Sequence, residues 1–216
     1  MMMEQLMSDF NDIALNIGKI APQSKVNGPG VRFAIWLQGC PLRCEGCINK
    51  EFWANEPNQL IRVPDLFKMI LDAPNVEGVT YSGGEPFEQA EGLYMLSSLL
   101  KARGLSIMAY SGYNYEELMN SADGSKKQLL SMLDILVDGR YEQEKSVPLL
   151  WRGSSNQKVY FLTPIYKEYE KIADQHKLQM EFSIDSKTNK VSIEGNFSQG
   201  ILAEIQSRMK EYGISI

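Results

Sequence analysis

The chain has 216 residues, of which 44% are hydrophobic and 10% aromatic, enough for one domain with a sizeable core. Its net charge of −5 argues against a general affinity for nucleic acids or anionic membranes. No apolar run approaches the ~20 residues of a membrane span. Residues 1–16 lack the basic and apolar regions of a secretion signal, so we expect a cytoplasmic protein.

Residues 12–20 alternate apolar and polar side chains and predict a first strand. Asn-Gly and Pro-Gly pairs at 26–30 predict a turn. The elements that follow, in chain order, are a strand at 31–38, a helix at 64–72, a strand at 78–81, a helix at 88–103, a strand at 105–110, helices near 114–120 and 125–133, and strands at 134–139 and 158–162. Strands that alternate with helices imply parallel β/α units, in which helices cover the sheet.

The chain is too short for a complete eight-unit barrel, which takes ~250 residues. We therefore predict an α/β fold, an open partial (β/α) barrel, for residues 1–175. Residues 176–216 differ, because 178–185 and 190–196 alternate around a turn and predict a hairpin. One helical face then follows, formed by Phe197, Ile201, Leu202, Ile205 and Met209. We predict a small C-terminal β-β-α appendage and expect it only to cap the sheet.

The three cysteines of the chain, Cys40, Cys44 and Cys47, lie in one loop with the spacing Cys-x3-Cys-x2-Cys. An odd, clustered set is a poor disulfide framework, and thiolates are the usual ligands of iron–sulfur clusters. Three ligands leave one iron of a cube open. A closed zinc site would need four ligands, and His176, the only histidine, lies about 130 residues later in a polar helical stretch. Ordinary buried cysteines are disfavoured by the Pro, Arg, Glu and Gly residues of the loop.

Residues 40–47 resemble the radical S-adenosylmethionine (SAM) signature, and 27–53 resemble activases of glycyl-radical enzymes. The subgroup that the chain resembles most contains the activating proteins of anaerobic, class III ribonucleotide reductases. Four further segments match that subgroup in the same order, at 81–86, 110–118, 136–139 and 152–157. The resemblance covers roughly residues 12–162.

The resemblance implies a [4Fe-4S] cluster whose open iron binds SAM through its amino and carboxylate groups. It implies reductive cleavage of SAM to methionine and a 5′-deoxyadenosyl radical, which abstracts hydrogen from a glycine of a partner reductase. It also implies a flavodoxin-like or ferredoxin-like electron donor. One alternative is a stand-alone radical SAM enzyme that acts on a small molecule or peptide. A non-enzymatic metal-binding or electron-transfer module is another, but it leaves the Gly83–Pro86 motif unexplained.

The resemblance also implies the residues that contact SAM. Gly83 and Gly84 would let the backbone approach the methionine ammonium closely, while Glu85 fixes their loop. Ser111 would contact the ribose and Asp138 the ammonium, although both residues also suit simple turns. Gly46, Cys47 and Ile48 complete the set, and Gly46 offers adenine only its backbone.

Three further features stay open in the sequence. Arg32 either pairs with the SAM carboxylate or ends its strand in solvent. The segment 152–157 binds a substrate tail, orders the cluster loop or caps a helix. Residues 50–53 form part of the rim that a partner meets, unless Phe52 and Trp53 belong to the core.

Overall fold

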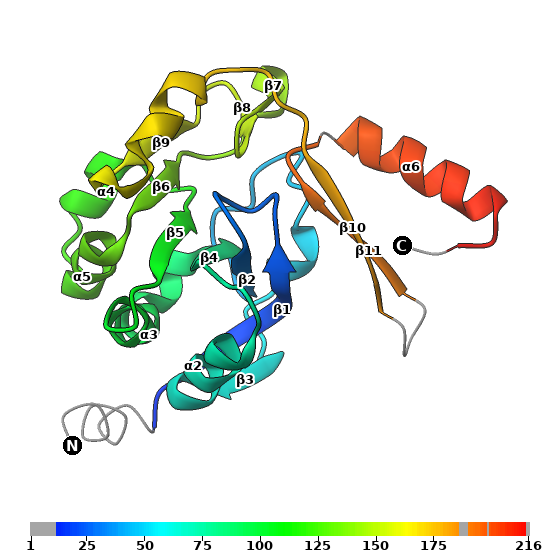
Figure 1. Cartoon of the computed structure of the whole chain (residues 1–216). Helices are drawn as coiled ribbons and strands as arrows, with labels where there is room; N and C mark the ends of the chain where they lie inside the picture. Colours follow the sequence, from blue (N-terminus) through cyan, green and yellow to red (C-terminus); the bar gives the residue numbers. More distant parts are fainter. Residues whose placement is uncertain (1–11, 186–189, 198, 215–216) are drawn as a thin grey trace.

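The computed structural model describes residues 12–185, 190–197 and 199–214, and its centre is a seven-stranded mixed sheet (Figure 1). Its strands are β1 (Ala14–Ser24), β2 (Arg32–Leu37), β3 (Gln59–Arg62), β4 (Gly78–Gly83), β5 (Ser106–Tyr110), β6 (Ile135–Asp138) and β9 (Lys158–Phe161). They lie in the order β3-β1-β2-β4-β5-β6-β9. All the strands predicted for the main domain are therefore present.

Four neighbouring strands, β2, β4, β5 and β6, run parallel, which confirms the predicted β/α units. The strands predicted at 12–20 and 158–162 are antiparallel to their neighbours, as is β3. A parallel pair needs a crossover of a dozen or more residues, and residues 25–31, which join β1 to β2, are too few. The short turn at 26–30 therefore sets the antiparallel direction of β1.

The predicted helices are also present, as α2 (Val63–Asp72), α3 (Ala90–Lys101), α4 (Tyr115–Met119) and α5 (Gly124–Met132). α3 begins later than predicted because Pro86–Gln89 forms a separate 3-10 turn, η2. Two other short 3-10 turns are η1 (Lys50–Phe52) and η3 (Gln143–Lys145). Asn114 and Glu117 cap α4 reciprocally, which explains why so short a helix begins there.

Both faces of the parallel strands are buried. Side chains alternate along a strand, so Ile107 and Ala109 face α2, α3 and α5, whereas Met108 faces the other side. That second side is covered by Trp151 and by η4 (Pro164–Ile172). Trp151 belongs to the turn between β7 (Ser146–Leu149) and β8 (Arg152–Ser154). Burial on both faces explains why these strands read as apolar runs.

The main sheet is open. β3 and β9 form its two edges, and among the described residues they do not pair with each other. The α/β class is confirmed, and the curvature of this sheet into a partial barrel stays a prediction. In the part of the chain that the structure describes, no helix has the length and apolar character that a bilayer span requires.

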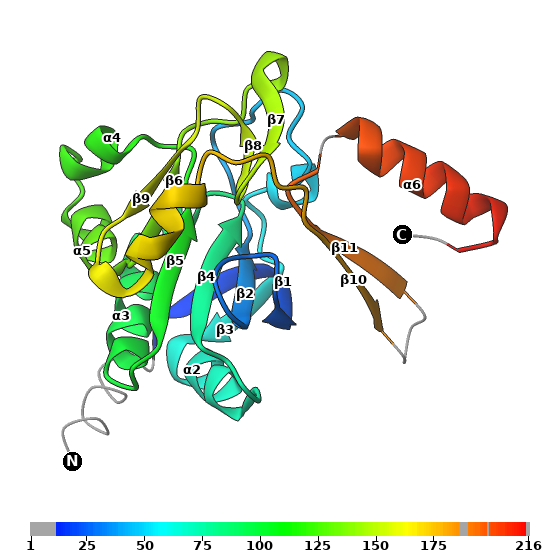
Figure 2. The same ribbon diagram turned by 45° about the horizontal axis from the view of Figure 1, so that its top comes forward.

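The C-terminal part follows the predicted β-β-α order, as β10 (Met180–Asp185), β11 (Lys190–Gly195) and α6 (Gln199–Glu211). β10 and β11 form a two-stranded sheet of their own. Figures 1 and 2 show this appendage to one side of the main sheet, away from α3 and α5. The expectation that it only caps the sheet is wrong, because it lines a cavity described below. The domain boundary at residues 175 and 176 stays a prediction.

Arg32 has neither of the two roles predicted for it. Its side chain is fully buried, so it does not end the strand in solvent. The guanidinium donates hydrogen bonds to Thr80 Oγ1, to the Val79 carbonyl and to Ser106. These acceptors lie at the starts of β4 and β5, the edge opposite to the predicted SAM residues. Arg32 therefore joins three strands at the end of the sheet opposite to the predicted SAM residues.

Three strands, β3, β7 and β8, were not predicted, and each has only three or four residues. Runs this short carry no periodicity that distinguishes a strand from a loop. His176 is exposed, as expected, but it forms an isolated bridge with Leu149 and is not part of a helix.

Candidate metal and cofactor site

The cysteine loop begins directly after β2 and is closed at its base. The Gly39 N–H donates to the Phe52 carbonyl at 2.8 Å, and the Cys40 N–H donates to the Trp53 carbonyl at 3.3 Å. Gln38 adds a hydrogen bond from its side-chain amide to the Ala54 carbonyl. These bonds hold the two ends of the loop together at the C-terminal edge of the parallel strands, where ligands of such sheets bind.

All three cysteines line one cavity of about 160 Å³. Each is partly buried, and none forms a disulfide. Arg43 and Gly46 have positive φ values of 50° and 73°, the left-handed backbone conformation that tight turns use. The Cys47 sulfur accepts a hydrogen bond from the Asn49 N–H at 3.4 Å. Burial is the main influence on the thiols and raises the pKa of each cysteine.

The three thiols can be compared with the ligand sets of a zinc ion and of an iron–sulfur cluster. Among the described residues, no three or more His, Cys, Asp or Glu side chains converge on the position of a single metal ion. A closed zinc site would need a fourth ligand, which the cysteine loop does not supply. A cube places each thiolate on a different iron, so its ligands need only border a shared cavity. Three thiolates around one cavity, with no histidine nearby, fit a [4Fe-4S] cluster.

The Gly83–Glu85 loop packs against the base of the cysteine loop. The Gly84 N–H donates to the Leu37 carbonyl at 2.8 Å, and the Glu85 N–H donates to the Gly39 carbonyl at 2.9 Å. A Cβ added at Gly84 would lie 2.2 Å from the Gly39 oxygen. Gly83 has φ +98°, which favours glycine. The two glycines therefore allow the backbone of this loop to contact the backbone of the cysteine loop. This need for glycine was not predicted from the sequence.

Glu85 is buried and joins two loops of the site. Its carboxylate accepts hydrogen bonds from Phe87 N and from Ser111 Oγ, at 3.0 and 2.9 Å, and from Gly112 N at 2.8 Å. Burial raises the pKa of Glu85 to about 7, against the lowering effect of these donors. Glu85 thus fixes its loop, as expected, and also holds the turn that follows β5.

Ser111 lines the same cavity as the cysteines. Its hydroxyl donates to Glu85 and accepts from Tyr113 N at 3.0 Å. A hydroxyl has one donor and two acceptor positions, so one acceptor position is left for a ligand.

Asp138 is buried at the end of β6 and does not line the cavity, although Gly139 does. Its carboxylate accepts a hydrogen bond from Tyr115 N at 2.7 Å, at the start of α4. This contact corresponds to the turn alternative for Asp138, and its predicted contact with SAM has no support in the geometry.

Comparison with known proteins agrees with this geometry. The family described as "4Fe-4S single cluster domain" matches residues 26–160. The anaerobic ribonucleoside-triphosphate reductase-activating protein of Enterobacteria phage T4 is 32% identical over 152 residues, which cover 68% of this chain and 94% of the phage protein. The chain belongs to the family of anaerobic ribonucleoside-triphosphate reductase-activating proteins. The resemblance noted in the sequence is confirmed.

Two further activating proteins are similar over almost their whole length. Those of Pasteurella multocida and Escherichia coli K12 are each 31% identical and are covered over 99%, whereas 69% and 68% of this chain take part. About a third of this chain therefore lies outside the part that it shares with these activating proteins. The match to the cluster domain ends at residue 160, before η4 and the whole appendage.

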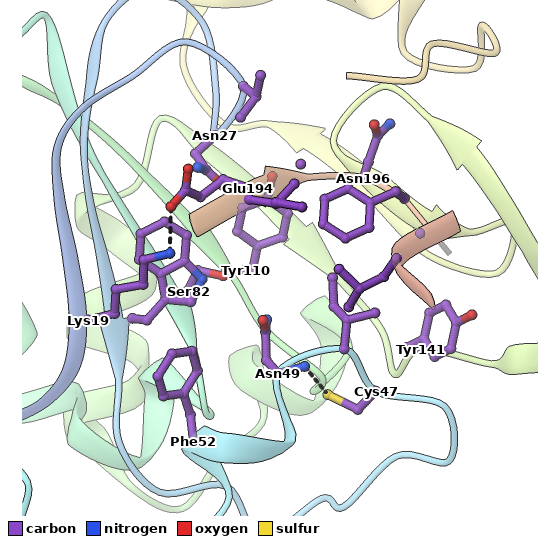
Figure 3. Close-up of a pocket in the computed structure, with 18 of the residues that line it drawn as sticks. Lys19, Asn27, Cys47, Asn49, Phe52, Ser82, Tyr110, Tyr141, Glu194 and Asn196 are labelled. Atoms are coloured by element: carbon purple, nitrogen blue, oxygen red, sulfur yellow. Dashed lines mark hydrogen bonds and ion pairs between the residues drawn. The ribbon is translucent and has the colours of Figure 1, made fainter. Parts of the chain in front are cut away.

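A second, larger cavity of about 470 Å³ adjoins the cysteine site. Six residues line both cavities: Cys47, Asn49, Ser82, Tyr110, Tyr141 and Gln157. Figure 3 shows Cys47 and Asn49 on one side of the larger cavity and Glu194 and Asn196 on the other. Gly46 and Ile48 line only this larger cavity. The appendage is therefore one of its walls.

Most residues of this larger cavity were not predicted as site residues from the sequence. Ser82 and Tyr110 each precede a residue that was singled out, and they lie at the same strand ends. Position at the C-terminal end of a predicted strand was thus a usable signal for both. No comparable signal marks Asn49 or Glu194, because the walls they form come from distant parts of the chain.

The segment 152–157 orders the loop that faces the cysteines. Gln157 accepts from the N–H groups of Gly153 and Ser154 and donates to the Gly139 carbonyl. A Cβ added at Gly46 would meet Gln143 at 2.4 Å and Tyr141 at 3.0 Å. Residues 139–143 therefore pack tightly on the cysteine loop. Of the three predicted roles for the segment, the contacts favour ordering the cluster loop.

The two aromatic residues at 52–53 have different surroundings. Phe52 is buried against Ala34 and Trp36, as the core alternative predicts. Trp53 is half-buried, lines the smaller cavity and lies beneath the Arg43 and Lys50 cations, 5.5 and 5.8 Å from its ring centre. Only Trp53 and its exposed neighbours Lys50 and Glu51 are placed as a rim would be.

Proposed function

We propose that this chain is a radical SAM oxidoreductase that generates a glycyl radical on a partner anaerobic ribonucleotide reductase. Cys40, Cys44 and Cys47 would hold the [4Fe-4S] cluster, and SAM would lie in the adjoining cavities. The observation that carries the proposal is one cavity bordered by three thiols, Gly84, Glu85 and Ser111, in a member of the activating-protein family.

When bound, the cluster and SAM would supply reductive cleavage of the sulfonium to methionine and the 5′-deoxyadenosyl radical. The chain itself would bind and orient the cluster and SAM and would screen them from solvent. We infer that the 83–85 loop meets the methionine end of SAM, that Ser111 accepts a hydrogen bond from a ribose hydroxyl, and that Gly46–Ile48 border the adenine. Asp138 would act on the site only through the turn that it forms with Tyr115.

Electrons would come from a flavodoxin-like or ferredoxin-like donor. The exposed residues Lys50 and Glu51, beside the cysteine loop, give such a donor a polar surface close to the cluster. The cytoplasmic location stays a prediction. It is supported by the three cysteines, which form no disulfide, because thiols persist in a reducing compartment.

The test is anaerobic reconstitution followed by reaction with the partner. The protein should bind about four irons, and Cys40→Ala, Cys44→Ala and Cys47→Ala should each abolish the cluster. His176→Ala, which alters the only histidine, is the control. With reductant, SAM and the reductase chain from the same genome, a doublet glycyl-radical EPR signal should appear on the reductase. Replacement of the reductase glycine by alanine should remove it.

A small-molecule substrate is the second candidate. The larger cavity has about 470 Å³, within the range of small-molecule sites of about 300–1,000 Å³. Deuterium labelling separates the two candidates. Label that passes into 5′-deoxyadenosine from a small molecule, with no radical on any protein, would favour the second candidate.

A further inference from the structure

We propose that the free edge of β11 binds an extended peptide segment of the partner protein, which then runs as an added strand through the larger cavity to the cysteine loop. The inference rests on the proposed function, because the segment would be the one that carries the target glycine. It assigns a role to the part of the chain that lies beyond the family match.

The larger cavity runs along the edge of β11. Successive side chains of a strand point to opposite faces, so a cavity on one face would touch every second residue. Here all residues from Val191 to Phe197 line the cavity in unbroken succession. The cavity therefore contacts residues from both faces of β11. This places it beside the strand, at the edge toward which backbone N–H and C=O groups point.

The register of the hairpin identifies those backbone groups. The Asn196 N–H donates to the Gln179 carbonyl, so these two residues form a hydrogen-bonded pair. Hydrogen-bonded pairs alternate along an antiparallel ladder. The pairs Glu181–Glu194 and Ser183–Ser192 are therefore also hydrogen-bonded, and the N–H and C=O groups of Val191 and Ile193 point away from β10.

In the described residues, β11 pairs only with β10. Its outer edge thus presents a donor and an acceptor at Val191 and again at Ile193. An extended peptide satisfies such a row by adding a strand, which gives affinity through backbone bonds. Alternate side chains along the strand give selectivity.

The appendage is held against the main domain by its other polar groups. Glu194, whose side chain is only 3% exposed, pairs with Lys19 of β1 at 2.5 Å (Figure 3). Lys19 also lies over the Trp36 ring, 5.1 Å from its centre. Glu181 accepts from the Lys25 N–H at 3.1 Å, and Asn196 donates to the Leu149 carbonyl. All three contacts are made by side chains of the appendage, so the outward N–H and C=O groups of β11 take no part in them.

The cavity leads from this edge to the proposed radical chemistry. It is lined by Gly46, Cys47, Ile48 and Asn49, and it shares Cys47 and Asn49 with the smaller cavity. A cavity of about 470 Å³ excludes a folded domain, and beside SAM at Gly46–Ile48 it would admit only an extended segment, along β11. Glycine suits the inner end of such a segment, because without a side chain its Cα can approach closely.

The test uses the full-length, reconstituted protein and a fluorescent synthetic peptide that spans the glycine loop of the reductase from the same genome. Ile193→Pro removes the outward N–H, and proline is tolerated on edge strands where that N–H faces outward. Ile193→Ala keeps the N–H and is the matched control. We expect Ile193→Pro to bind the peptide about tenfold more weakly than Ile193→Ala, as the loss of a backbone hydrogen bond predicts.

A second measurement leaves the protein unchanged. Peptides N-methylated at successive residues should bind the wild-type protein with an alternating loss of affinity, because an added strand uses every second N–H. Circular dichroism and iron content establish that Ile193→Pro folds. If it does not fold, the methylated peptides decide alone.

The outcomes separate this inference from the proposed function. Equal peptide affinity of Ile193→Pro and Ile193→Ala, or a methylation profile without alternation, overturns the inference even if the reductase acquires its radical. A concentration-dependent dimer that Ile193→Pro abolishes would assign the edge to a second copy and also overturn it. Wild-type protein that cleaves SAM but leaves no radical on the reductase instead overturns the proposed function.

Discussion

At the scale of single residues, Gly84 links the two loops of the site most directly. Its missing side chain lets the Gly83–Glu85 loop touch Gly39, the residue before the first cysteine. We expect Gly84→Ala to displace the cysteine loop, with a stability loss of about 1–3 kcal/mol, as in other overpacked sites. Iron content after reconstitution should fall with it.

The control for that prediction is Gly124→Ala. Gly124 has no heavy atom within 4 Å of an added Cβ, and it begins α5. Its iron content should equal that of the wild type. If Gly84→Ala has the iron content of the wild type but binds SAM more weakly, the packing role is contradicted. Gly84 would then have the role predicted from the sequence, a close backbone approach to SAM.

Glu85 predicts a pH dependence of the apoprotein. Its pKa is raised from 4.5 to about 7, so the folded chain binds a proton that the unfolded chain has lost between these values. The stability that this proton contributes is present below pH 4.5 and is lost as the pH rises through 7, by up to about 3 kcal/mol. Urea unfolding at pH 5 to 8 should therefore show the advantage of wild type over Glu85→Gln shrinking with pH. A constant difference would contradict this prediction.

Residue identity alone was enough to predict that the three cysteines form one site. It was not enough to predict the burial and the hydrogen bonds of Arg32. Three thiols in eight positions have few other uses, so their spacing carries the chemistry. An arginine before an apolar strand looks like a strand end, because burial of its guanidinium depends on acceptors from two other strands. Those acceptors are 47 to 74 residues away, and no local pattern announces them.

At the scale of elements, the ion pair between Lys19 and Glu194 links β11 to β1. Glu194→Ala removes the partner of Lys19 and should increase the local opening of the hairpin about tenfold, with a small change in the global free energy of unfolding. Hydrogen exchange of the β10 and β11 amides measures this. Glu204→Ala, which breaks an exposed pair with Arg208 on α6, should leave the exchange rates of the hairpin unchanged. Equal exchange in the two variants would mean that other contacts hold the appendage.

The elements themselves were largely predictable, and their arrangement was only partly so. Alternation and helical periodicity gave the strands and helices of the parallel units, since both patterns are local. The antiparallel direction of β9 and the contact of β11 with β1 depend on pairing at long range. Lys19 and Glu194 are 175 residues apart, and neither has a neighbour that would mark it as a partner.

At the scale of the whole molecule, the sequence correctly placed the cysteines, Gly83–Glu85 and Ser111 at one edge of a parallel sheet. It did not predict the second cavity. Side chains from β1, the cysteine loop, the 139–143 loop and the appendage form that cavity together. Such a wall is a property of the packed chain, and no single segment contains it.

Removal of the cluster gives the prediction at this scale. The main core lies between the sheet and α2, α3 and α5, and it includes none of the cysteines. We expect the iron-free protein to keep the circular dichroism of the reconstituted protein and to unfold in one cooperative transition. A molten, dye-binding apoprotein would contradict this prediction.

The closeness of the three ligands in sequence has a consequence for cluster assembly. Cys40 and Cys47 close a loop of only eight residues, so little chain entropy is lost when they bind the same group. A cluster held this way does not crosslink distant segments, so the fold of the sheet does not depend on it. A cluster destroyed by dioxygen can therefore be reassembled in the folded protein, without unfolding and refolding of the chain.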